Sequence, residues 1–174
     1  MLKNDKWIKR ILSALVYPFY EAHVNPSTYD FTWSGRYRYM HQGGEYIETW
    51  DKEQVMGMWT EVQEADTLVL EPFKLYLLDT EEVMEIPINV TGLLLLKSSI
   101  ARAGIEHLHA GLFDPGYGLG NPSTGTLEVI NVTPYNLVIK KGQRLVQMAF
   151  FPTATPDKDY RFTGRYNGSV NPTA

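Results

Sequence analysis

The chain of 174 residues contains no cysteine, which excludes disulfide bonds and every metal site built on thiolates. It also lacks an apolar run of the ~20 residues that a membrane-spanning helix requires. Its formal net charge is −4, so it has no overall positive field with which to hold a long nucleic acid. These absences favour a cytoplasmic protein that binds neither membranes nor long nucleic acid.

Several well-known catalytic signatures are also missing. The chain has no P-loop, no dinucleotide-binding fingerprint, and no His-x-Glu followed by the Pro-Cys-x-x-Cys of zinc deaminases. Lys9 and Arg10 interrupt the apolar residues near the N-terminus, so no secretory signal is expected. His107 and His109 would share one side of a strand, but a third ligand at suitable spacing is not evident. The sequence therefore predicts no zinc site.

Short strands dominate the part of the sequence that remains. Alternating or continuous apolar runs, separated by turn residues, predict strands at 29–33, 36–41, 67–78 (two strands broken near Pro72), 90–96, 107–113, 125–131, 136–142 and 144–151. This pattern indicates an all-β fold: a sandwich, jelly roll or barrel. The length favours one domain, 1–174, in which the polar segment 153–174 forms a mobile tail.

Two short helices are expected beside the strands. Helical spacing of apolar residues predicts a helix over 5–16, capped by Asp5 and ended by Pro18. The stretch "KSSIARAG" (97–104) predicts a second helix, capped by Ser98 or Ser99 and closed by Gly104. The fold is thus mainly β, with one short N-terminal and one short internal helix.

Four clusters offer chemistry, and each also has a plain structural interpretation. "KSSIAR" (97–102) places hydroxyls and two cations at a helix start, which suits an anion, or is simply a capped surface helix. Asp114 opens a turn that includes Tyr117, and turn aspartates are common. Glu128 lies in an apolar strand, where it is either a poised general base or a side chain that reaches solvent. The tail (160–170) either folds over a phosphate or is disordered.

The order of these segments resembles the trimeric dCTP deaminase and dUTPase superfamily. The resemblance covers about residues 90–170 and rests on "KSSIAR", "HLHAGLFDPGY", "GTLEVIN", "KKGQRLVQMAFF" and the basic tail, taken in that order. "NPSTYDF" (25–31) is similar to the first motif of the family, with Asp30 as its acid, whereas 34–66 match loosely. The resemblance implies a distorted β jelly roll of dUTPase-like type, a homotrimer, and active sites at subunit interfaces.

Within this superfamily, Glu128 points to the deaminase branch, which carries a glutamate in this strand followed closely by asparagine, here Asn131. The resemblance implies hydrolytic deamination of dCTP to dUTP without zinc. Glu128 would take a proton from the water that attacks C4 of cytosine, and partial burial beside Arg102 would tune its pKa. Ser98 and Arg102 match positions that orient the water and the glutamate. His109 and Ala110 match positions whose backbone groups read the base.

The same resemblance assigns residues to the rest of the nucleotide. Tyr117 matches an aromatic residue that packs under the deoxyribose. Mg²⁺ would arrive on the triphosphate and not in a protein cage. Lys97 replaces the usual arginine of the family, which keeps the charge and loses the bidentate fork. The expected phosphate contacts are Lys97, Ser98, Ser99 and Gln147, with Arg161 and Arg165 in a tail that closes over the site.

Three functions remain open on the sequence. Gly111 and Leu112 precede Asp114 in a form seen in dUTPases and in bifunctional enzymes that take dCTP to dUMP and pyrophosphate, where the Asp114 position holds the water that attacks the α-phosphate. The preferred function is dCTP deamination, ending at dUTP or continuing to dUMP. The alternatives are a dUTPase, or a non-catalytic nucleotide- or protein-binding member of the fold. The segment 118–125 is longer than typical, and an odd-numbered shift there would turn Glu128 to the other sheet face.

Overall fold

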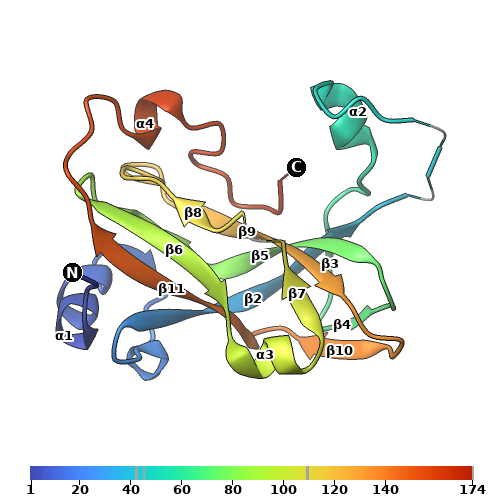
Figure 1. Cartoon of the computed structure of the whole chain (residues 1–174), viewed down its shortest axis with the longest axis horizontal. Helices are drawn as coiled ribbons and strands as arrows, with labels where there is room; N and C mark the ends of the chain where they lie inside the picture. The colour runs from blue at the N-terminus through green and yellow to red at the C-terminus, as the bar shows by residue number, and fades with distance from the viewer. Residues whose placement is uncertain (42, 45, 109, 174) are drawn as a thin grey trace.

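The computed structural model describes residues 1–41, 43–44, 46–108 and 110–173, and it is built mainly of strands (Figure 1). This confirms the predicted all-β class. Helical segments are short and lie around the strands. They are α1 (Asp5–Trp7), a π-helical turn (Ile8–Leu12), a 3₁₀ turn (Glu21–His23), α2 (Lys52–Gly57), α3 (Ser98–Arg102) and α4 (Tyr160–Thr163).

The strands of the described residues form one large curled sheet and one small sheet (Figure 1). The large sheet has the order β7-β9-β5-β2-β11-β6-β8, with β1 added on β5 and β3 on β2, and β10 pairs with β4. All pairs are antiparallel. The bounds are β1 (Val16–Tyr17), β2 (Thr28–Tyr39), β3 (Gln63–Glu64), β4 (Thr67–Leu70), β5 (Leu75–Met84), β6 (Val90–Leu96), β7 (Ile105–His107), β8 (Leu112–Phe113), β9 (Ser123–Asn131), β10 (Leu137–Lys140) and β11 (Arg144–Pro152).

Alternation along β9 separates its core side from its open side. Leu127 and Val129 are buried, at 0% and 1% exposure, whereas Thr126 and Glu128, which alternate with them, are partly exposed. Since successive strand residues point to opposite faces, the two polar residues share the open face. The core on the other face is built from large apolar side chains, among them Tyr29, Phe31, Trp33, Leu78, Met84, Leu127, Val146 and Phe150.

The N-terminal helix differs from the prediction at both ends. The cap is Asn4 and not Asp5, because the Asn4 side chain accepts a hydrogen bond from the Trp7 N–H at 3.1 Å. The helical segment ends at Leu12 and does not continue to residue 16. Val16 pairs with Met84 as part of β1, so pairing with β5 overrides the local helical pattern.

The internal helix was predicted correctly at its C-terminal end and wrongly at its cap. Gly104 follows the helix with a φ of +86°, the left-handed conformation that glycine adopts most readily. The N-cap position is occupied by Lys97, which makes no side-chain capping bond, and Ser98 is already the first helical residue. Ser98 and Ser99 are exposed. Their hydroxyl groups are therefore not used by the cap.

The C-terminal tail lies along β9 and contains α4 (Figure 1). The Thr124 N–H donates to the carbonyl oxygen of Ser169 at 2.8 Å, and the Gly168 N–H donates to Ser123 Oγ at 2.7 Å. The tail thus covers part of β9 on its own chain. Among the described helices, none is long and apolar enough to cross a membrane.

Candidate active site

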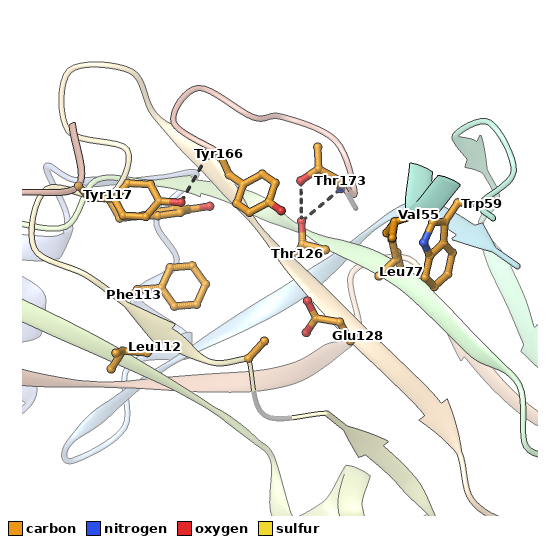
Figure 2. A pocket seen from close by; sticks show the side chains of 12 residues that line it. Val55, Trp59, Leu77, Leu112, Phe113, Tyr117, Thr126, Glu128, Tyr166 and Thr173 are labelled. Carbon is orange, nitrogen blue, oxygen red and sulfur yellow. Dashed lines mark hydrogen bonds between the residues drawn. The ribbon is translucent and has the colours of Figure 1, made fainter. Parts of the chain in front are cut away.

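A cavity of about 420 Å³ lies above the open face of β9, between α2 and the C-terminal tail (Figure 2). This volume is in the range of sites for small molecules. The carboxyl group of Glu128 and a group of aromatic rings face it. The lining residues are Val55, Trp59, Leu77, Ala110, Leu112, Phe113, Tyr117, Thr126, Glu128, Tyr160, Tyr166 and Thr173.

Glu128 presents an incompletely bonded carboxyl group to this cavity. Its side chain is 26% exposed, and its buried Oε2 accepts no hydrogen bond from the residues that the structure describes. Nε2 of His107 lies 3.8 Å from Oε2. Burial raises the pKa of Glu128. A carboxyl group with a raised pKa and a free acceptor atom is suited to proton transfer with a bound ligand.

The long 118–125 segment leaves the register of β9 suitable for this role. Glu128 points into the cavity with Thr126, while Leu127 and Val129 fill the core (Figure 2). The odd-numbered shift that would have turned Glu128 away has not occurred.

Aromatic rings form the wall on one side of Glu128 (Figure 2). Tyr117 is 7% exposed, and its hydroxyl donates to the carbonyl oxygen of Thr124 at 2.6 Å. The Tyr117 ring packs edge-to-face on Phe113, with 4.8 Å between centroids, and lies 5.1 Å from the Tyr160 ring. Burial raises the pKa of Tyr117, so its hydroxyl remains a donor at neutral pH. This wall is an aromatic surface with its rings already packed together, which suits contact with a sugar or a base.

The wall on the other side of Glu128 is formed by Val55, Trp59 and Leu77 (Figure 2). Leu77 on β5 is the direct partner of Glu128 in the sheet. Val55 lies on α2, and Trp59 follows that helix. Val55 and Trp59 were not predicted as site residues, because the segment 34–66 has no recognisable motif and meets β9 only in the folded chain.

The predicted phosphate residues Lys97 and Gln147 lie away from the cavity. Lys97 Nζ is 2.6 Å from Oδ2 of the fully buried Asp30, which Arg144 Nη1 also approaches at 3.2 Å. Gln147 Oε1 accepts a hydrogen bond from Thr28 Oγ1 at 3.0 Å. The first-motif acid thus binds two cations, and neither Lys97 nor Gln147 lines the cavity in one chain.

Ser98, Ser99 and Arg102 are exposed on α3, and none of them lines the cavity. Arg102 therefore does not meet Glu128 within one chain, where burial raises the Glu128 pKa. The reason is the position of α3. It lies beside β7 at the bottom of Figure 1, whereas α2 and the C-terminal tail, which border the cavity, lie at the top. An interfacial site would supply these residues from a second copy, and that arrangement stays a prediction.

The remaining predicted residues are dispersed around the turn and the tail. Ala110 lines the cavity, whereas His109 lies outside the described residues. Asp114 is exposed, and its carbonyl oxygen accepts from the Tyr117 N–H at 3.1 Å. Arg161 is held by Asp159 through bonds of 2.9 and 2.7 Å, and Arg165 is exposed. Closure of either arginine over a phosphate stays a prediction.

Metal ligands do not cluster in the described part of the chain, where no three His, Asp or Glu side chains are placed to hold an ion. His107 lies beside Glu128, and the other histidine of the predicted pair is outside the described residues. Deamination without zinc therefore stays a prediction.

Comparison with known proteins identifies the family of the chain. The sequence matches the family model described as dCTP deaminase-like over residues 1–153. The chain belongs to the dCTP deaminase-like family. This family member is 31% identical over 156 residues to a "dCTP deaminase, dUMP-forming" of Methanosphaerula palustris, covering 88% of this chain and 81% of that protein. It is 29% identical over 171 residues to a "dCTP deaminase" of Pyrobaculum aerophilum, covering 97% and 92%.

The fold of this family member is also found in a solved structure. The 2'-deoxycytidine 5'-triphosphate deaminase from Agrobacterium tumefaciens superposes with a TM-score of 0.67 at 17% identity. The match covers 86% of this chain and 48% of that one, so the chain spans about half the length of that protein. At this identity the superposition shows a shared fold, which confirms the predicted dUTPase-like class.

Proposed function

We propose that the chain is a dCTP deaminase that converts dCTP and water to dUTP and ammonia, with Glu128 as the general base and no zinc. The observation that carries this proposal is the buried Oε2 of Glu128, which lies at the wall of a ligand-sized cavity and accepts no hydrogen bond from the described residues. Membership in the dCTP deaminase-like family supports it.

The proposed step balances with one water molecule. Glu128 takes a proton from water as the water oxygen bonds to C4 of cytosine. The protonated carboxyl group then gives that proton to the exocyclic amine, the C4–N bond breaks, and ammonia leaves. The second water proton passes from the new C4 hydroxyl to N3, which gives the 4-keto form of uracil. Burial raises the pKa of Glu128, which brings its proton affinity closer to that needed for both transfers. Because the reaction starts from the ionised carboxylate, the rate is expected to rise with pH through this raised pKa.

The rest of the nucleotide is bound partly by this cavity and partly by residues outside it. The Tyr117 ring supports the deoxyribose, and backbone groups at 109–110 read the base. Lys97, Ser98, Ser99 and Gln147 bind the triphosphate, which brings its own Mg²⁺. Arg161 and Arg165 close over it from the tail. Tyr160, Tyr166 and Thr173 of that tail already line the cavity, which supports this last role.

We further propose a homotrimer in which each site combines two subunits. The support is the separation described above: Glu128 lines a cavity that lacks Ser98 and Arg102, and those two residues are exposed on α3. A subunit-mixing experiment tests the arrangement. Glu128→Gln and Arg102→Gln are each inactive alone, but random mixing into trimers restores about one quarter of the sites, since a site needs one intact residue from each of two copies. Mixtures that remain inactive would contradict the shared site.

The proposed activity continues from dUTP to dUMP and pyrophosphate. Relatives such as that of Methanosphaerula palustris carry the name "dUMP-forming", and Gly111 and Leu112 precede Asp114 as in bifunctional enzymes. The exposed Asp114 lies in the turn that leads to Tyr117, where it would hold the water that attacks the α-phosphate.

The decisive experiment is incubation of the purified protein with dCTP and Mg²⁺, followed by assay of ammonia and separation of dUTP from dUMP. Glu128→Gln is expected to lower ammonia release by about 10²- to 10⁴-fold, because it removes the general base, while nucleotide affinity is kept. Glu64→Gln, an exposed change of the same type, is the matched control and should leave the rate unchanged.

Three results would contradict the proposal. Ammonia release by Glu128→Gln at the wild-type rate would exclude the mechanism. Pyrophosphate release from dUTP without ammonia from dCTP would indicate a dUTPase. Nucleotide binding without turnover would indicate a binding module of the same fold.

A further inference from the structure

We propose that the cavity accepts cytosine nucleotides with a small apolar substituent at C5, such as 5-methyl-dCTP, and that Val55, Trp59 and Leu77 form the corner that receives it. This inference rests on the proposed deamination. It adds the substrate class that the walls around Glu128 select.

The first support is the position of Leu77 beside the reacting group. Leu77 on β5 is the direct antiparallel partner of Glu128 on β9. Side chains of such partners lie on the same face, with their Cβ atoms about 5 Å apart. Leu77 is only 3% exposed and lines the cavity. The apolar side chain of Leu77 is therefore a direct neighbour of the Glu128 carboxyl group in the cavity.

The second support is that the corner is preformed. Trp59 is 8% exposed and forms a bridge with Met40 at the end of β2. The next residue is tied down as well, since the Thr60 N–H donates to the carbonyl oxygen of Tyr39 at 3.0 Å. Val55 stands on α2 in front of the indole (Figure 2). Backbone pairing with the end of β2 therefore fixes the chain that carries the indole.

The third support is the direction of the base. Tyr117 and Phe113 lie on one side of Glu128, and the Val55–Trp59–Leu77 corner lies on the other (Figure 2). In a cytosine nucleotide the sugar is on N1, C4 is across the ring from N1, and C5 is next to C4. With the sugar on Tyr117 and C4 at Glu128, the ring substituents that can reach the corner are the exocyclic amine on C4 and a group on C5. The amine is polar and must meet Glu128, so the apolar corner suits the C5 substituent. An apolar C5 substituent would replace water against three apolar side chains.

The experiment compares kcat/KM for 5-methyl-dCTP and dCTP in the same preparation, so the ratio is independent of the folded fraction. Wild-type protein is expected to use 5-methyl-dCTP at least as well as dCTP. Val55→Phe fills the corner and is expected to lower the ratio by about 10-fold or more, the range of one misplaced methyl group in an apolar pocket. Val138→Phe, at an exposed position of strand β10 and outside the cavity, is the matched control and should leave the ratio unchanged.

A wild-type ratio below about one hundredth would overturn the inference, as would an unchanged ratio in Val55→Phe. A stronger gain with N4-methyl-dCTP than with 5-methyl-dCTP would assign the corner to the amine and overturn it too. Absence of ammonia from dCTP itself contradicts the proposed function instead. In that case calorimetry compares the binding of dCTP and 5-methyl-dCTP to Glu128→Gln and to the double variant that also carries Val55→Phe. If Val55→Phe changes the affinity for the two nucleotides equally, the inference about the corner is overturned.

Discussion

Asp79 and Glu128 lie on the same face of neighbouring strands, yet their carboxyl groups have opposite surroundings. Asp79 on β5 pairs in register with Thr126, two residues before Glu128 on β9. Asp79 is 0% exposed and accepts bonds from Ser34 Oγ and from Arg36, whose Nη2 is 2.5 Å away. Oε2 of Glu128 accepts none from the described residues. The acid with partners joins β5 to β2, and the acid without them is left for a ligand.

Asp79→Asn is expected to lower the free energy of unfolding by about 3–5 kcal/mol, because it leaves the Arg36 guanidinium without its anionic partner in a site that water reaches poorly. Arg36 is only 29% exposed. Urea denaturation measures the change. Glu64→Gln, which breaks the exposed Glu64–Lys141 ion pair, should leave the midpoint unchanged. Similar midpoints for the two variants would remove the distinction between partnered and exposed acids.

The buried Glu82 is expected to make the stability depend on pH. It is 0% exposed, it accepts from the Thr32 N–H at 2.9 Å, and burial raises its pKa to about 7. Since the pKa is higher in the folded state, the stability is complete below about pH 4.5 and falls as pH rises to about 7, by roughly 3 kcal/mol.

Glu82→Gln tests this pH dependence. The variant should flatten the stability curve between these pH values, as measured by urea denaturation at each pH. His23 Nδ1 lies 3.6 Å from the carboxyl group and is kept in both proteins. Parallel curves for the variant and the wild type would show that Glu82 is not the titrating group.

Glu128→Gln is expected to have the smallest effect on stability, in contrast to Asp79→Asn. The amide removes a partly buried negative charge. Among the described residues, the ion-pair contact to this carboxyl group is His107 Nε2, at 3.8 Å. Because burial raises the Glu128 pKa, the wild type loses stability as pH rises through that pKa and the variant does not. The variant should therefore be no less stable than the wild type at pH 8. A loss of more than about 1 kcal/mol would place Glu128 among the structural acids.

The sequence predicted the strand that carries Glu128 because the alternation of β9 is a local property. Leu127 and Val129 are apolar and buried, and the acid between them had to face the other side. The same reasoning failed at the N-terminus, where pairing of Val16 with Met84 overrides a helical pattern. Local periodicity cannot reveal a partner that lies 68 positions away in the chain.

The site was predicted in part for the same reason. Motifs identified Ala110, Tyr117 and Glu128, which line one cavity. Val55 and Trp59 come from a segment without a motif, and only the curl of the sheet brings α2 over β9. The sequence also could not predict which residues Arg102 contacts, because α3 and the cavity lie apart in one chain.

The bond from the Thr124 N–H to Ser169 has a consequence for solubility. β7 pairs with β9 only at residues 129–131, so the first half of β9 would present unpaired backbone groups without the tail. Bare strand edges template pairing between molecules. The C-terminal tail, which borders the cavity, therefore also covers an edge that could pair with another molecule. Shortening the tail for crystallisation or expression would leave this edge of β9 unpaired and favour aggregation.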